Sequence, residues 1–287
     1  MILRPRVLSL LLLALALALA GCAHADANPG RASATPTGRA PILVTSTAIS
    51  AVVTSAGTFD LAGGTVEGRV LLEGNLPPVP KRVITVDRAV CGSDPREDRS
   101  LLLDAASHGV RYAAVTLTPH GPGIAAAPPA AGTHVAIEQS RCEFFPYITF
   151  IAPGGSVDAV NDDAALHDLH RLPPNGPGSH DPAPPGVTVP LLFAQEGRTK
   201  LVCDLHYWSS AWVIATSAPF AAVTDSTGRF RFRNVPPGKW TLNVWHERLG
   251  EKTIDVDVPS GEVVEETIGF TLPKPTPPGA RPTATLP

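Results

Sequence analysis

Residues 224–247 read TDSTGRFRFRNVPPGKWTLNVWHE and decide the fold class. Charged and aromatic side chains alternate along 229–233, which places Phe230 and Phe232 on one face of a predicted strand. The segment 225–228 (DSTG) has the composition of a hairpin turn, and 240–245 (WTLNVW) predicts a further strand. The pattern therefore favours β-structure.

Similar short segments extend outward from this stretch in both directions. They are rich in β-branched and aromatic residues and are separated by Gly, Pro, Asn and Asp. The chain of 287 residues has 25 Gly and 31 Pro, which together make up about a fifth of the total. In an average protein, Gly and Pro together account for about 12% of residues. Hydrophobic residues still make up 44%, enough for a packed core. We expect an all-β protein with β-sandwich architecture, with strands at 65–73, 110–118, 133–138, 147–151, 199–202 and 253–258.

The first 21 residues are typical of a signal peptide. Arg4 and Arg6 precede an apolar run over 7–20, shorter than the ~20 residues that span a bilayer. The run ends in LAGC, which resembles the lipobox of bacterial lipoproteins and implies lipid on Cys22 after cleavage. Ala23 follows, which favours an exported, lipid-anchored protein of the outer membrane that faces the periplasm or the cell surface. The alternative is an ordinary signal peptide with an incidental cysteine.

The mature chain is expected to begin and end without packed structure. Residues 22–60 read as a flexible tether, although 42–53 (ILVTSTAISAVV) could form one strand. Residues 273–287 form a Pro-rich tail. Loss of residues 1–21 would change the net charge from −3 to −5, and no Lys/Arg cluster suggests a nucleic-acid partner.

No sequence pattern supports catalysis. The chain lacks a nucleophile elbow, a phosphate loop and a dinucleotide fingerprint. The adjacent acids Asp162 and Asp163 are expected on a solvated face, and His134 and His180 as strand or surface histidines without partners. We expect a binding or electron-transfer protein and no enzyme.

If Cys22 carries lipid, three cysteines remain. An oxidising compartment would join two of them and leave one thiol. We favour a disulfide between Cys91 and Cys142 with Cys203 free. A bond that involves Cys203 remains open, because three cysteines allow three pairings.

A free Cys203 would have His206 three residues further on, so that one tight loop could present a thiolate and an imidazole together. His167 and His170 lie upstream in NDDAALHDLH. One thiolate and two imidazoles are the ligands of a trigonal blue-copper site, and zinc accepts the same donors. Asp168 could orient an imidazole.

Six segments resemble, in this order, exported cupredoxin-like proteins of the methylamine-utilization type with a carboxypeptidase-regulatory-like (transthyretin-like) C-terminal domain. They are VCG, QSRCEFFPYI, NDDAALHDLH, LVCDLHYWSSAWV, APFAAVTDSTGRF and VPPGKWTLNVWHE. The resemblance covers about residues 61–272. It implies a cupredoxin-like Greek-key sandwich over 61–217 and a smaller transthyretin-like sandwich over 218–272. By position it places the copper ligands on His167, Cys203 and His206. Apart from the resemblance, His170 is expected to support the site or lie at the surface, with a further ligand as the alternative, and Asp168 is expected to be a solvated loop acid unless it orients an imidazole.

The chain departs from these relatives at two positions. Ser209 stands where they commonly have the axial Met, and Tyr147 where they often have a His. A His2Cys copper site without that Met is chemically reasonable, since the axial bond is long and mainly tunes the potential. The resemblance thus implies a lipoprotein that passes single electrons to an unknown redox partner. The alternatives are a metal-free binding or structural lipoprotein, a zinc site, and copper storage or delivery.

Overall fold

The structure is a computed structural model that describes residues 62–121, 124 and 134–273. The expected signal peptide, the lipid attachment at Cys22, the tether and the strand at 42–53 lie outside these residues, as does the tail after Pro273. Within the described part of the chain, no helix is both long enough and apolar enough to cross a membrane.

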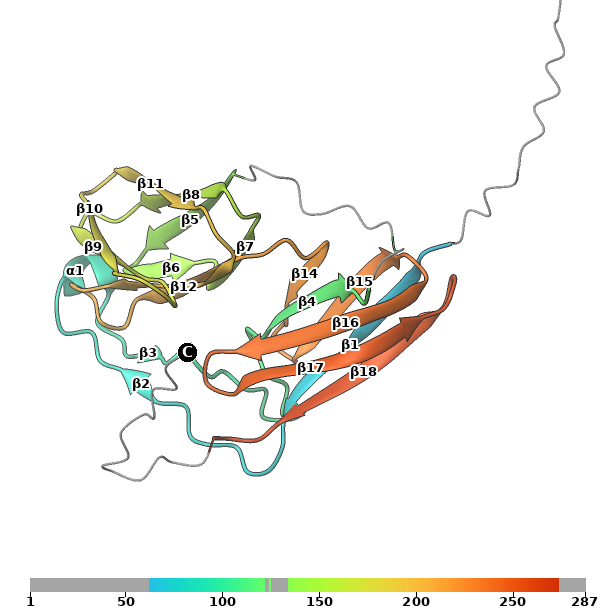
Figure 1. The fold of residues 1–287 in the computed structure, drawn as a ribbon. Coiled ribbons are helices and arrows are strands. Elements are labelled where there is room, and N and C mark those ends of the chain that lie inside the picture. Colours follow the sequence, from blue (N-terminus) through green and yellow to red (C-terminus); the bar gives the residue numbers. More distant parts are fainter. Residues whose placement is uncertain (1–61, 122–123, 125–133, 274–287) are drawn as a thin grey trace, which may run out of the picture. The chain divides into compact units, whose positions relative to one another are not determined.

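The first sandwich consists of a five-stranded sheet, in the order β10-β9-β12-β13-β7, and a four-stranded sheet, in the order β11-β8-β5-β6 (Figure 1). The chain passes repeatedly from one sheet to the other, as between β7, β8 and β9. The bounds are β5 His134–Ser140, β6 Glu143–Phe145, β7 Ile148–Ile151, β8 Gly155–Asn161, β9 His167–Leu172, β10 Ser179–Ala183, β11 Thr188–Phe193, β12 Gly197–Cys203 and β13 Ser210–Ala215.

The second sandwich consists of a three-stranded sheet, in the order β15-β1-β18, and a four-stranded sheet, in the order β14-β4-β16-β17. A one-turn helix and a two-stranded ribbon lie in the sequence between β1 and β4. The bounds are β1 Gly64–Leu72, β2 Lys81–Arg82, α1 Arg88–Cys91, β3 Arg96–Glu97, β4 Ala114–Pro119, β14 Phe220–Val223, β15 Arg229–Val235, β16 Gly238–His246, β17 Gly250–Val258 and β18 Val263–Phe270.

The all-β prediction is confirmed, but the division into 61–217 and 218–272 is wrong for two strands. β1 pairs with β15 and β18, and β4 pairs with β14 and β16. The second sandwich therefore takes strands from both segments. Strand pairing over such long separations leaves no local signal, because each strand shows only its own alternation.

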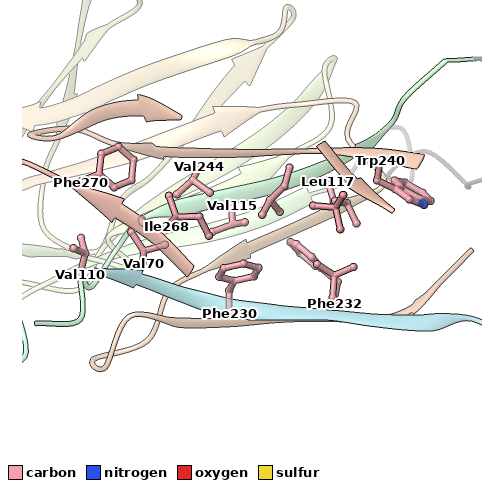
Figure 2. Packing of buried hydrophobic residues seen from close by; sticks show 14 of the residues in the cluster. Val70, Val110, Val115, Leu117, Phe230, Phe232, Trp240, Val244, Ile268 and Phe270 are labelled. Atoms are coloured by element: carbon pink, nitrogen blue, oxygen red, sulfur yellow. The ribbon is translucent and has the colours of Figure 1, made fainter. Parts of the chain in front are cut away.

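The core of the second sandwich explains why these strands are needed. Figure 2 shows Val70 of β1 and Val115 of β4 among side chains of β15, β16 and β18. Phe230 and Phe232 point into this core from β15, as their alternation predicts, and the three arginines that alternate with them are exposed. Complete burial of such a side chain is worth about 1.5–3 kcal/mol, so the segment 218–272 alone would lose much of its core.

The turn over 225–228 is present, but it does not close a hairpin. Asp225 accepts hydrogen bonds from the backbone N–H groups of Thr227 and Arg229, and Gly228 has a φ of 78°. β14 and β15 on either side belong to different sheets. The turn therefore carries the chain from one layer of the sandwich to the other.

Candidate metal centre

A thiol and two imidazoles meet at one end of the first sandwich. His167 is the first residue of β9, Cys203 is the last residue of β12, and His206 lies in the short loop before β13. Cys203 Sγ lies 3.5 Å from His167 Nδ1 and 3.4 Å from His206 Nδ1. All three residues are buried, and their donor atoms form one group. The structure thus brings together the three residues predicted as metal ligands.

Each imidazole is held from its far side by a carboxylate. His167 Nε2 lies 3.0 Å from Asp163 Oδ2, and His206 Nε2 lies 3.0 Å from Asp87 Oδ2. Because a carboxylate only accepts hydrogen bonds, the proton of each neutral ring belongs on Nε2. Both Nδ1 lone pairs are then directed at the space beside Cys203.

Burial sets the protonation of the metal-free cluster. Desolvation lowers the pKa of His167, against the opposing effect of its hydrogen bond to Asp163. Desolvation also raises the pKa of the Cys203 thiol. The imidazole therefore stays neutral, as a metal ligand must be, whereas the thiol would release its proton on metal binding.

The distances fit three donors around one ion. Metal–nitrogen and metal–sulfur bonds of about 2.0 and 2.3 Å, at angles of about 105–120°, separate the two donor atoms by roughly 3.4–3.8 Å. The observed separations of 3.4 and 3.5 Å fall at the lower end of this range. Both sulfur–nitrogen separations therefore fit a small transition-metal ion bound by the thiolate and an imidazole.

The predicted disulfide between Cys91 and Cys142 is present, and Cys203 is outside it. Cys91 ends α1, the helix that Asp87 precedes. Cys142 donates its backbone N–H to Asp163, at 2.7 Å. The bond thus ties together the two segments that supply or hold the carboxylates behind the imidazoles.

The loop between Cys203 and β13 is closed by backbone hydrogen bonds. Ser209 donates its N–H to the carbonyl of His206, at 2.7 Å, and accepts at its own carbonyl from Cys203, at 3.1 Å. Ser209 is 1% exposed. Ser209 is therefore a buried residue, and its hydroxyl has no hydrogen-bond partner among the residues that the structure describes.

His170 and Asp168 do not join this cluster. They alternate with the inward-facing His167 and Leu169 along β9 and lie nearer the surface. His170 Nδ1 faces Asp204, and Asp168 faces His180. This geometry does not match the expectation that His170 and Asp168 support the three ligands directly.

Asp163 and Asp87 are the functional residues that the sequence analysis missed. Asp163 was expected on a solvated face with Asp162, yet it is 7% exposed and accepts from the N–H groups of Arg141 and Cys142 as well as from His167. Its position four residues before His167 was the available signal. Asp87 reaches His206 from a distant segment, and no local pattern indicates it.

Comparison with known proteins finds cupredoxins among the solved structures. No protein-family model and no curated protein matches the chain. A purple cupredoxin from Nitrosopumilus maritimus is 22% identical, at a TM-score of 0.26, over 29% of this chain and 99% of that one. Amicyanin from Paracoccus versutus is 17% identical, at a TM-score of 0.27, over 35% and 98%.

A third similar structure is a larger protein. The copper-containing nitrite reductase NirK from Thermus scotoductus is 20% identical, at a TM-score of 0.27, over 34% of this chain. The match spans a quarter (25%) of the nitrite reductase. Each of the three similarities thus covers about a third of the chain.

Proposed function

We propose that the protein binds one copper ion through His167, Cys203 and His206 and transfers single electrons. The observation that carries this proposal is the convergence of Sγ and two Nδ1 atoms, with both Nε2 atoms already held by carboxylates. Bound copper would supply the one-electron redox couple. The protein's part is to hold the three donors fixed and dry, so that little reorganises when the charge changes.

The chemistry of the donors favours copper over zinc. A soft thiolate with two imidazoles suits a trigonal copper site, whereas structural zinc sites close with four protein ligands. Where the resembling proteins commonly have an axial Met this chain has Ser209, whose hydroxyl would be a weak ligand. β9 and β12, neighbours in the five-stranded sheet, hold His167 and Cys203 at strand ends, and the hydrogen-bonded loop before β13 holds His206. This support would keep the geometry nearly the same in either redox state.

Electrons would leave the metal centre through the loop that contains His206. His206 itself is buried beneath Asp87, but its neighbours Leu205 and Tyr207 are 44% and 56% exposed. Apolar side chains around a buried redox centre let a partner come close without the cost of stripping water from charges. A redox partner protein is proposed to dock there.

The rest of the proposal concerns the place of the protein in the cell. The lipobox-like LAGC supports export and attachment to a membrane through lipid on Cys22, with residues 22–60 as a tether that lets the folded part reach its partner. The protein is proposed to act as a carrier and not as an enzyme. Copper storage or delivery would use the same ligands, so it is a second outcome of the test.

The test is a Cu(II) titration of the chain from residue 23 onward, with Cys203→Ser as the matched variant. An intense visible thiolate-to-copper band and a narrow copper hyperfine splitting, both absent from the variant, are the expected result. Reversible reduction by an external donor separates electron transfer from storage. A colourless protein that keeps one free thiol would contradict copper binding and favour a metal-free binding lipoprotein.

A further inference from the structure

A second group of metal-binding side chains lies on the outer side of β9. It consists of His170, His180 and Asp204, with Asp168 next to His180. His170 Nδ1 lies 3.2 Å from Asp204 Oδ1, and His180 Nδ1 lies 3.4 Å from Asp204 Oδ2 and 3.3 Å from Asp168 Oδ2. From these atoms we infer a second metal site, which binds a divalent transition-metal ion such as Zn(II) through imidazole nitrogen and carboxylate oxygen.

Strand geometry explains why the two histidines meet. His170 on β9 and His180 on β10 are directly opposite each other in the antiparallel ladder, so both side chains leave the same face of the sheet. Their rings stack with centroids 4.0 Å apart. Gly178 leaves room for this arrangement, because a Cβ there would lie 2.9 Å from His170 Nε2.

The distances favour a shared ion over simple ion pairs. Charge-assisted hydrogen bonds between nitrogen and carboxylate oxygen measure about 2.7–2.9 Å. The three contacts here are 3.2–3.4 Å. Tetrahedral bonds of about 2.0–2.1 Å to nitrogen and oxygen separate the donors by roughly 3.3–3.4 Å. The two contacts of His180 match this separation, and the contact of His170 is slightly shorter.

The charge of the group also favours a cation. With neutral imidazoles, Asp168 and Asp204 give it two negative charges. No lysine or arginine within the described ranges forms an ion pair with either carboxylate. Asp168 Oδ1 is buried and has no hydrogen-bond partner there either. A divalent ion would balance both charges.

This site is separate from the buried cluster. Along β9, His167 faces the interior, whereas Asp168 and His170 face outward. In the same way, Cys203 is buried and Asp204 is exposed. The two groups therefore share strands but no ligand, and the outer one contains only nitrogen and oxygen donors. A site with nitrogen and oxygen donors favours borderline metal ions and does not require a thiolate ligand.

The experiment is a calorimetric Zn(II) titration of the chain from residue 23 onward in a Cys203→Ser background, which removes the thiolate of the buried cluster. We expect saturable binding of one ion. His180→Ala removes a half-exposed ligand and should weaken binding by at least about a hundredfold, because losing a direct ligand costs more than the ~10–100-fold loss on removing an outer carboxylate. Asp204→Asn, which keeps the side-chain shape, should weaken it to a similar degree.

The matched control is His134→Ala. His134 is an exposed strand histidine paired with Asp158 at 2.9 Å, and among the described residues it belongs to no group that could hold a metal ion. Its loss should leave the Zn(II) affinity unchanged. The proposal fails if Zn(II) does not bind saturably, or if His180→Ala and His134→Ala change the affinity equally. Neither result bears on copper, because the thiolate is absent from every protein in the series.

Discussion

Asp87 and His206 are 119 positions apart in the sequence, yet Asp87 Oδ2 lies 3.0 Å from His206 Nε2. Asp87 occupies the N-cap position of α1 with a φ of 48°, but its side chain makes no cap hydrogen bond. A left-handed backbone at a non-glycine residue costs on the order of 1–3 kcal/mol. The carboxylate thus holds an imidazole of the candidate metal centre in place of capping its own helix.

The two carboxylates behind the imidazoles should not be equivalent. Asp163 is 7% exposed and serves three N–H groups, whereas the Asp87 side chain is 50% exposed. We expect Asp163→Asn to lower copper affinity by about 10–100-fold, and Asp87→Asn to lower it less, because solvent screens that carboxylate. Competition against a copper chelator measures both. Asp162→Asn, a change at the exposed neighbouring acid, should have no effect, and an equal loss in all three variants would refute this ranking.

Ser209 is predicted to set the reduction potential. If its hydroxyl stands at the axial position, Ser209→Met adds a thioether ligand and should lower the potential relative to the unaltered protein. The larger side chain in a buried place should also cost about 1–3 kcal/mol of stability. Protein-film voltammetry measures the potential, and Ser209→Leu, similar in size but without sulfur, is the control. A shift of the same size in both variants would show that packing alone is responsible.

The disulfide is predicted to stabilise both the fold and the site. It closes a loop with a sequence separation of 51, for which loop entropy gives about 4 kcal/mol. The double variant Cys91→Ser/Cys142→Ser should lose stability of this order in urea unfolding. Its copper affinity should also fall, because α1 and the Cys142 turn are no longer joined. Unchanged affinity in a folded double variant would show that Asp87 and Asp163 are held by other contacts.

His246 predicts a pH dependence that is independent of metal. Burial lowers its pKa from 6.5 to about 4. The unfolded chain therefore binds the proton more readily between these values, and stability rises with pH across this window. At pH 7 the contribution is fully present, and it is lost progressively as the pH falls from 6.5 to 4, by about 3 kcal/mol.

The measurement is the free energy of unfolding of the metal-free chain at several pH values. His246→Leu should flatten the curve between pH 4 and 6.5, whereas His134→Leu, at an exposed histidine, should leave its slope as it is. Parallel curves for the unaltered chain and His246→Leu would contradict the assignment.

Local sequence patterns predicted much of the fold, and the rest depends on the pairing of strands that are distant in the sequence. Alternation at Phe230 and Phe232 correctly indicated a strand and its buried face, and the favoured pairing of Cys91 with Cys142 was confirmed. The membership of β1 in the second sandwich was missed, because a parallel pair with β18 joins segments nearly two hundred residues apart. Asp87 was missed because it, too, lies far from its partner in the sequence. The outer cluster was missed because His180 and His170 become neighbours only through the pairing of β9 with β10.

The most direct test of the copper proposal is X-ray absorption spectroscopy at the copper edge of the chain loaded with one equivalent. The proposal predicts one short sulfur scatterer and two imidazole nitrogens, with the sulfur lost in Cys203→Ser. A spectrum with only nitrogen and oxygen scatterers, and a Cys203 thiol that still reacts as a free thiol, would contradict it. Copper would then be bound away from the buried cluster.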